Sequence, residues 1–287
     1  MGYRRRASPL HAARAAAGSA LCGALVLTAL LFDDPLVLGA VIAAALAAGA
    51  LAGVWPQLRR ALLFALPFTL AIALLNPLVT EQGVTVIWRF GELPLLGDRD
   101  ITLEAVVYGL LLGLRALAVI VSFALFSATV DPDQLLRLFR RVSFRSALTA
   151  TLATRMVPVL QRDGQRIADA QRCRPGPPPS RLTLVRAVTA GALDRAVEVA
   201  AALEVRGYGA ARRPPRGAAA PWSRHDLAFT GAAAAVVALA LGARLAGVAS
   251  FEVYPRIVAS WDAATLLLCA ALVVVPLLPF LDRRGIE

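Results

Sequence analysis

Two arginines at the ends of helix-like segments are the residues of this chain best suited to act on a partner surface. Arg174 is followed by Pro175 and Arg206 by Gly207, so a helix breaker stands directly after each, and the two arginines are 32 residues apart. A guanidinium offers a rigid fork of donors that binds carboxylates and backbone carbonyl oxygens. Ordinary C-capping is the alternative, because a basic residue at a helix C-terminus gains about 0.3–1 kcal/mol from the helix dipole.

The two arginines lie in a basic block, residues 131–224, that separates apolar segments. The block holds 17 Arg against 7 Asp and Glu, which accounts for nearly all of the net charge of +11 on the 287-residue chain. Hydrophobic residues make up 58% of the sequence and charged residues 17%, which excludes an ordinary soluble domain. A basic block between membrane spans follows from the positive-inside rule, so we expect no nucleic-acid partner.

Six apolar stretches are long enough, or nearly so, to cross a bilayer, which takes about 20 helical residues. They cover residues 15–32, 36–55, 61–79, 103–130, 227–246 and 263–281. The segments between them are alternately basic and acidic. Positively charged loops stay on the cytoplasmic side, so the pattern predicts a multi-pass protein of the bacterial plasma membrane with both termini in the cytoplasm.

The basic block is expected to contain three helices. Asp131 can cap the first and Pro132 suits its first position. A second helix is expected over residues 144–172, with a kink or break at Pro158. Residues 181–205 have apolar side chains at steps of three and four, which predicts a third, amphipathic helix.

The predicted fold class is an all-α integral membrane protein with about six transmembrane helices and cytoplasmic amphipathic helices. Residues 1–130 would hold the first four spans, with an extracytoplasmic hairpin near residues 80–102. Residues 131–224 would form a cytoplasmic module, and residues 225–287 the last two spans.

Arg115 lies near the middle of the fourth predicted span. A charge at that depth costs at least about 2.5–3.5 kcal/mol, so its side chain should face protein or water. It is either a structural arginine, bonded to helix ends or to a polar group such as Asn76, or part of an interface with a partner. The cysteines and histidines are scattered without metal-ligand spacing, so we expect neither a metal site nor a disulfide framework.

The motifs of the chain, taken in order, resemble the transmembrane T-component of energy-coupling factor (ECF) transporters, the EcfT/CbiQ family. Ala202-Leu203-Glu204-Val205-Arg206-Gly207-Tyr208-Gly209 is similar to the family's Ala-Arg-Gly signature with its preceding Glu. Ala170-Gln171-Arg172-Cys173-Arg174 resembles the companion Ala-Gln-x-Ala-Arg-Gly motif. Further similarities lie at residues 93–105, 131–135 and 155–158.

The chain departs from the family pattern at three positions. Cys173 and Val205 each stand where Ala is usual, and Pro175 stands where Gly or Ser is usual. Proline disfavours the α region for the residue before it, so the role of Arg174 is in more doubt than that of Arg206.

The resemblance implies a non-catalytic coupling subunit of an ABC importer. In this family two ATP-binding-cassette ATPases, as a homodimer or heterodimer, bind cytoplasmic coupling helices. A separate membrane S-component captures a vitamin or a transition-metal ion such as cobalt. ATP is then used by partner subunits, and this chain binds no cofactor. The implied coupling residues are Arg174, Arg206, Glu204, Gly207, Ala170 and Gln171.

Two other functions fit an apolar multi-pass chain. A polytopic membrane enzyme needs acids, histidines or metal ligands converging at one membrane face, and the sequence shows no such group. A self-contained secondary transporter often has two similar halves, and no duplication is visible. The chain also lacks a GxxxxGK[ST] phosphate loop, so we do not expect it to hydrolyse ATP itself.

Overall fold

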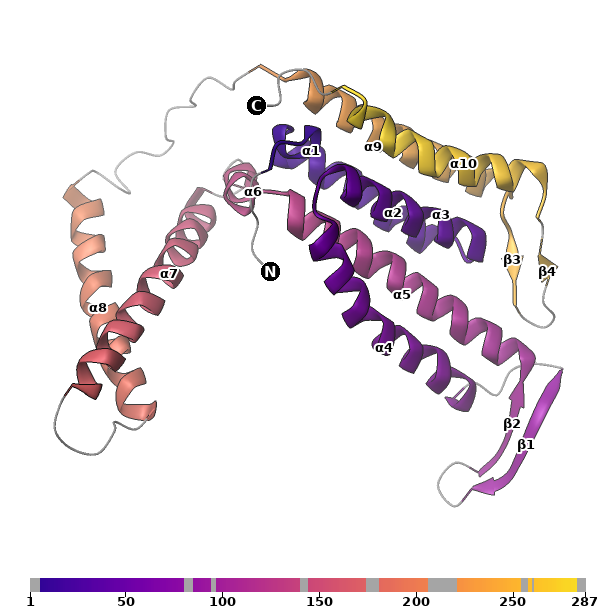
Figure 1. The fold of residues 1–287 in the computed structure, drawn as a ribbon, viewed down its shortest axis with the longest axis horizontal. Coiled ribbons are helices and arrows are strands. Elements are labelled where there is room, and N and C mark those ends of the chain that lie inside the picture. Colours follow the sequence, from indigo (N-terminus) through magenta and orange to yellow (C-terminus); the bar gives the residue numbers. More distant parts are fainter. Residues whose placement is uncertain are drawn as a thin grey trace. The chain divides into compact units, whose positions relative to one another are not determined.

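The computed structural model describes residues 6–79, 85–93, 97–139, 144–173, 181–205, 221–253, 258–259 and 261–282. These residues are mostly helical (Figure 1), which confirms the predicted all-α membrane fold. The long helices are α2 (Ala15–Leu31), α3 (Pro35–Leu51), α4 (Trp55–Val79), α5 (Leu103–Thr129), α7 (Phe144–Arg172), α8 (Arg181–Val205), α9 (Arg224–Leu245) and α10 (Ala263–Leu277). The short elements are α1 (Pro9–Ala12), α6 (Pro132–Phe139), the 3-10 helix η1 (Leu278–Phe280), and the strands β1 (Val86–Leu93), β2 (Gly97–Thr102), β3 (Phe251–Glu252) and β4 (Val258–Ala259).

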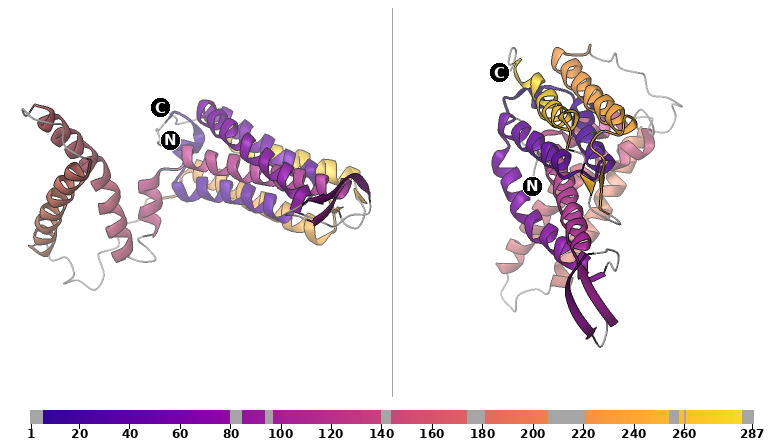
Figure 2. Two further views of the ribbon diagram at one scale, coloured as in Figure 1. Left: turned by 90° about the horizontal axis from the view of Figure 1, so that it is seen from below. Right: turned by 90° about the vertical axis from the view of Figure 1, so that its right-hand side faces the viewer.

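The chain divides into two compact units. The bundle unit consists of Met1–Leu135 and Trp222–Glu287, and the crossed-helix unit of Leu136–Pro221. In the bundle unit β1 pairs with β2, and β3 with β4, as two antiparallel ribbons. Figure 2 shows the helices of the bundle unit running side by side.

Four helices within the described residues are long and apolar enough to cross a membrane. They are Trp55–Pro77, Leu103–Thr129, Arg224–Leu245 and Ala263–Phe280. The apolar helices α2 and α3 have 17 residues each, which is near the lower limit of about 17 for a span. All six predicted apolar stretches are therefore helical, and two of them are short.

A tight turn sets the boundary between α3 and α4. Gly53 has a φ of +72°, in the left-handed region that glycine adopts without strain. The Arg6 guanidinium donates to the Gly53 carbonyl oxygen and closes the N-terminal segment over this turn. The second predicted span therefore ends four residues early, at Leu51, and α4 begins at Trp55. No break occurs at Pro158, since α7 continues through it.

The core of the bundle unit is made of small and branched apolar side chains. Helix α2 packs against α3, α5 and α9, and α10 packs against α3 and α9. Fully buried side chains at these contacts include Leu21, Leu25, Val41, Val121, Leu125, Phe229, Val236 and Leu272. One side of α4 remains exposed, with large apolar side chains from Leu63 to Leu75, as expected for a surface that meets lipid or another membrane subunit.

Helices α4 and α5 approach each other closely at two glycines of α5. A Cβ on Gly109 would lie 2.7 Å from the carbonyl oxygen of Ala73, and one on Gly113 would lie 2.8 Å from that of Thr69. The two glycines are four residues apart, the small-xxx-small spacing that lets membrane helices pack backbone to backbone. Any larger side chain at either position must push α4 away.

A buried carboxylate joins the beginnings of α2 and α9. Asp226 is 1% exposed. Its Oδ1 accepts from the Arg14 amide at 2.7 Å, and its Oδ2 lies 3.2 Å from the Arg14 Nε. The same Oδ2 accepts from the Ser223 amide, and the Ser223 hydroxyl accepts from the Asp226 amide, which completes a capping box. One side chain therefore accepts hydrogen bonds at the starts of two helices, and its partner Arg14 lies 212 residues away in the sequence.

We predict that Gly113→Leu destabilises the bundle unit by about 1–3 kcal/mol, because the side chain overpacks the α4–α5 contact. Denaturation of the purified chain in mixed micelles would measure this. Gly231→Leu in α9 is the matched control, since a Cβ there meets nothing within 4 Å. Equal stability of the two variants would contradict close packing at Gly113.

We also predict that Asp226→Ala lowers the free energy of unfolding by about 2–3 kcal/mol, because it removes charge-assisted hydrogen bonds from a buried site. Asp282→Ala provides the comparison. Asp282 lies 3.8 Å from Arg224 in a solvent-exposed pair, and its loss should cost no more than about 1 kcal/mol. The same denaturation series would measure both variants. A smaller loss of stability in Asp226→Ala than in Asp282→Ala would show that the contacts of Asp226 with Arg14 and Ser223 are dispensable.

Candidate functional site

Helices α7 and α8 cross each other and form the crossed-helix unit (Figure 1). At the crossing, the Arg195 Nη1 of α8 donates to the Asp163 Oδ2 of α7 at 2.6 Å. Next to this pair, a Cβ on Gly164 would lie 3.7 Å from the Val188 Cγ2. An ion pair and an apolar side chain of α8 therefore both face α7 in this region.

Asp163 is surrounded by positive charge. The hydrogen bond from Arg195, together with the charges of Arg195, Arg166 and Arg162, holds the pKa of Asp163 below its usual range. Arg162 also donates from its Nε to the carbonyl oxygen of Pro158 one turn earlier. The carboxylate therefore stays ionised well into the acidic range.

Helix α8 carries apolar side chains on two faces. Leu184, Val188, Ala192, Val199 and Leu203 form the half-buried face. Leu182, Val185, Leu193 and Val197 form a second stripe, at steps of three, eight and four residues, and each of them is at least 60% exposed. We call this stripe the outer stripe of α8. Packing between α7 and α8 leaves it uncovered.

The sequence-predicted coupling residues lie at the C-terminal ends of α7 and α8. Ala170 is exposed and Gln171 half-buried in the last turn of α7. Glu204 is exposed in the last turn of α8. Arg174, Arg206 and Gly207 lie outside the described residues. In sequence, Arg206 directly follows the last residue of α8, and Arg174 stands two residues after the last residue of α7.

Arg115 of α5 reaches the end of a neighbouring helix. Its Nη2 donates to the Phe32 carbonyl oxygen at 3.1 Å and pairs with the Asp33 carboxylate. Phe32 is the C-cap of α2, where unsatisfied carbonyls carry partial negative charge. Asn76 lies elsewhere, over Gly109 of α5. The partner of Arg115 is thus a helix end within the bundle unit.

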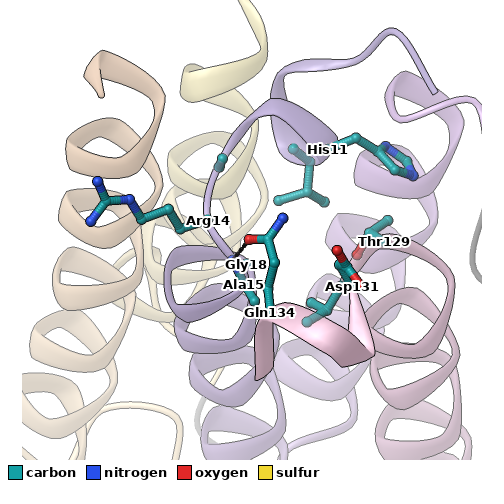
Figure 3. Close-up of a pocket in the computed structure, with 10 residues that line it drawn as sticks. His11, Arg14, Ala15, Gly18, Thr129, Asp131 and Gln134 are labelled. Atoms are coloured by element: carbon teal, nitrogen blue, oxygen red, sulfur yellow. Dashed lines mark hydrogen bonds between the residues drawn. The ribbon is translucent and has the colours of Figure 1, made fainter. Parts of the chain in front are cut away.

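The start of α6 is anchored on the bundle unit around a small pocket (Figure 3). The Asp131 Oδ1 accepts from the Asp133 amide at 2.9 Å and caps α6. Gln134, on the first turn of α6, reaches toward the start of α2, where its Oε1 accepts from the Ala15 amide at 3.2 Å. Among the described contacts, this hydrogen bond connects the segment that follows α5 with the N-terminal end of α2.

His11 lines the same pocket and is 5% exposed. Its Nδ1 lies 2.6 Å from the Ser8 hydroxyl. Burial lowers the pKa of His11, the charge of Arg6 lowers it further, and a hydrogen bond with the Ala128 backbone opposes the shift. The imidazole is therefore neutral at pH 7. In the part of the chain that the structure describes, no three His, Cys, Asp or Glu side chains are grouped to hold a metal ion.

Comparison with known protein families matches residues 6–215 to CbiQ, described as cobalt transport protein. This match covers most of the chain. The protein belongs to the CbiQ cobalt transport family. It is therefore a multi-pass membrane component of a multi-subunit cobalt-type transporter, and the predicted membership of the EcfT/CbiQ family is confirmed. No curated protein matches the chain closely enough to add a relative.

Two contacts of this CbiQ family member were missed by sequence reasoning. Gln134 belongs to a family-like motif, but its partner Ala15 lies 119 residues away and no local pattern indicates it. The Asp163–Arg195 pair spans 32 residues across two helices. The sequence held one indication of this pair: Asp163 and Arg195 each stand eleven residues before the arginine of their own motif, Arg174 and Arg206. Eleven residues are about three helical turns, so the two side chains have equivalent places on the two helices.

We predict that His11 titrates below its ordinary pKa of about 6.5 in the folded protein. As the pH falls below 6.5, the unfolded chain takes up this proton first. The stability contribution of the neutral imidazole is therefore lost between the ordinary and the lowered pKa. NMR of ¹⁵N-histidine-labelled His225→Asn protein, in which His11 is the only imidazole, would give the midpoint. A folded-state midpoint at or above that of the unfolded chain would contradict the burial argument.

Proposed function

We propose that this chain is the coupling subunit of an ECF-type importer and that α7 and α8 carry ATPase motion to a substrate-binding membrane subunit. The observation that supports this most is the crossing of two long helices, held at one point, with a family-like arginine motif at the C-terminal end of each. Two ABC ATPase subunits would grip these ends, and ATP would be bound and hydrolysed there and not on this chain.

The chemistry of the helix ends suits a protein partner. Helix α8 ends with exposed Glu204 and Val205, directly before Arg206. The guanidinium of Arg206 can bind carboxylates or helix-end carbonyls of an ATPase. Glu204 would orient it or pair with a basic group of the same partner.

The outer stripe of α8 supports a second contact. Leu182, Val185, Leu193 and Val197 present an apolar strip along more than half of the helix. Apolar surface of this extent marks an interaction site. We assign it to the substrate-binding membrane subunit, which would slide or tilt on the strip when the ATPases change the positions of the helix ends. The family description favours a cobalt ion as the cargo.

Reversing the charge of Arg206 tests the proposal. Arg206→Glu should leave membrane insertion intact and reduce co-purification of the ATPases at least about tenfold, because it replaces an attractive ion contact with a repulsive one. Arg186→Glu is the matched control, since Arg186 is an exposed arginine of α8 far from its C-terminal end. Undiminished ATPase binding by Arg206→Glu would remove this residue from the mechanism.

Arg174→Glu should act in the same direction and less strongly, because Pro175 restricts the backbone of Arg174. ATP-dependent cobalt uptake by cells that produce the complete transporter is the measurement. Full uptake in this variant would show that α7 contributes no arginine contact, whereas a defect larger than that of Arg206→Glu would reverse the assigned order.

A further inference from the structure

The ion pair between Asp163 and Arg195 is the strongest polar contact that the structure describes between α7 and α8. Its N–O distance of 2.6 Å is at the short end for a charge-assisted hydrogen bond. Both side chains are partly shielded, with 35% of Arg195 and 23% of Asp163 exposed. Among the described residues of this unit, Arg172 also pairs with Asp169, but this pair lies within α7 and is 70% or more exposed.

An apolar side chain lies beside the ion pair. Gly164 follows Asp163 directly, and a Cβ added at Gly164 would lie 3.7 Å from the Val188 Cγ2 of α8, an ordinary van der Waals distance. Val188 and Arg195 are seven residues apart, so they occupy the same side of α8 two turns apart. Val188 and Arg195 therefore both lie on the side of α8 that faces α7, and the ion pair is the described polar contact between the two helices there.

The crossing is equally far in sequence from the two arginine motifs. Beyond Asp163, α7 continues for nine residues to Arg172, and beyond Arg195, α8 continues for ten to Val205. These arms are about 14 Å and 15 Å long at 1.5 Å per residue. In Figure 1 they leave the crossing in different directions. A rotation of about 10° at the crossing would move each arm end by about 3 Å.

We propose that Asp163 and Arg195 are a positioning pair for transport, which holds the two coupling helices at one angle so that force applied at one helix end reaches the other. This inference rests on the proposed coupling function and adds residues that touch neither ATP nor cargo. The pair acts as the pivot of the two arms, and without it each arm moves independently.

Removing one member should loosen the crossing without unfolding the unit. In Arg195→Gln, the Asp163 carboxylate keeps Arg162 and Arg166 on its own helix as electrostatic partners. Broken ion pairs usually destabilise a protein because they leave a buried charge without a partner. The Asp163 carboxylate in this variant is not such a charge. Asp194→Asn, at the exposed position next to Arg195, and Arg186→Gln, at another exposed position of α8, make the same changes of charge without removing a member of the ion pair.

A distance measurement on the full chain tests the geometry without the other subunits. Nitroxide labels would be placed on native Cys173, which is exposed, and on Val205→Cys, where the native side chain is 90% exposed. Cys22→Ala and Cys269→Ala remove the other thiols. Electron–electron double resonance should show one narrow distance distribution, and Asp163→Asn and Arg195→Gln should each broaden it. Unchanged distributions in both variants, or equal broadening in the two control variants, would overturn the pivot.

Transport by the reconstituted complex tests the coupling. The measurement is the number of cobalt ions taken up per ATP hydrolysed, with bound ATPase quantified in the same vesicles. Arg195→Gln should lower this ratio by about 2- to 30-fold, the range for residues that modulate coupling, while ATPase binding stays unchanged. Arg195→Lys, which keeps the charge, should recover part of it. An oxidised Gly164→Cys/Val188→Cys cross-link, made in a background free of other cysteines, should restore the ratio in Arg195→Gln.

The two levels of failure are distinguishable. A wild-type chain that binds no ATPase would contradict the proposed function, together with any role of the pair in coupling. Normal ATPase binding with an unchanged ratio in Arg195→Gln would overturn the positioning role alone. A cross-link that fails to restore a lowered ratio would also overturn it, because the angle would then not be the property that matters.

Discussion

Backbone groups at the end of a helix need partners, and inside a membrane protein water is not available to supply them. In the bundle unit the Asp34 and Asp226 carboxylates meet this need at helix beginnings. Asp34 accepts from the amides of Leu36 and Val37 at the start of α3. Asp226 serves α2 and α9 together. At the start of α5 the Thr102 hydroxyl accepts from the Ala105 amide, and Glu104 in the first turn accepts from the Thr85 amide before β1. Each charge also lies where the helix dipole favours it.

This constraint explains why so few polar side chains suffice for the bundle. Once the helix ends are satisfied, the helices need only approach closely, and small residues allow that. Gly109 and Gly113 bring α5 onto the backbone of α4, and Arg115 satisfies the end of α2 from the side. The remaining apolar surface is free to meet lipid or other membrane subunits. The crossed-helix unit follows different rules, because its helices are largely exposed and, among the described residues, meet through the Asp163–Arg195 ion pair and the half-buried apolar face of α8.

A division of mechanical roles follows from these two kinds of packing. The bundle unit is tied together by buried polar joints and continuous apolar contacts, which resist deformation. The crossed helices have a single described crossing point and long arms, so rotation there is the easiest motion available to them. The proposed coupling role needs both properties, since the chain would have to stay anchored while its helix ends follow the ATPases.

The sequence alone determined the helices, their approximate ends and the family, because apolar run length, capping residues and motif order are local properties. The bounds of α7 and α8 follow from breakers such as Pro175 and Gly207. The turn at Gly53 was missed, since its neighbours are as apolar as a span. Only the tertiary structure decided which distant residues meet: Asp226 with Arg14, Gly113 with Thr69, Asp163 with Arg195. Such contacts depend on the path of the whole chain, because residues far apart in sequence become neighbours only after the helices have packed.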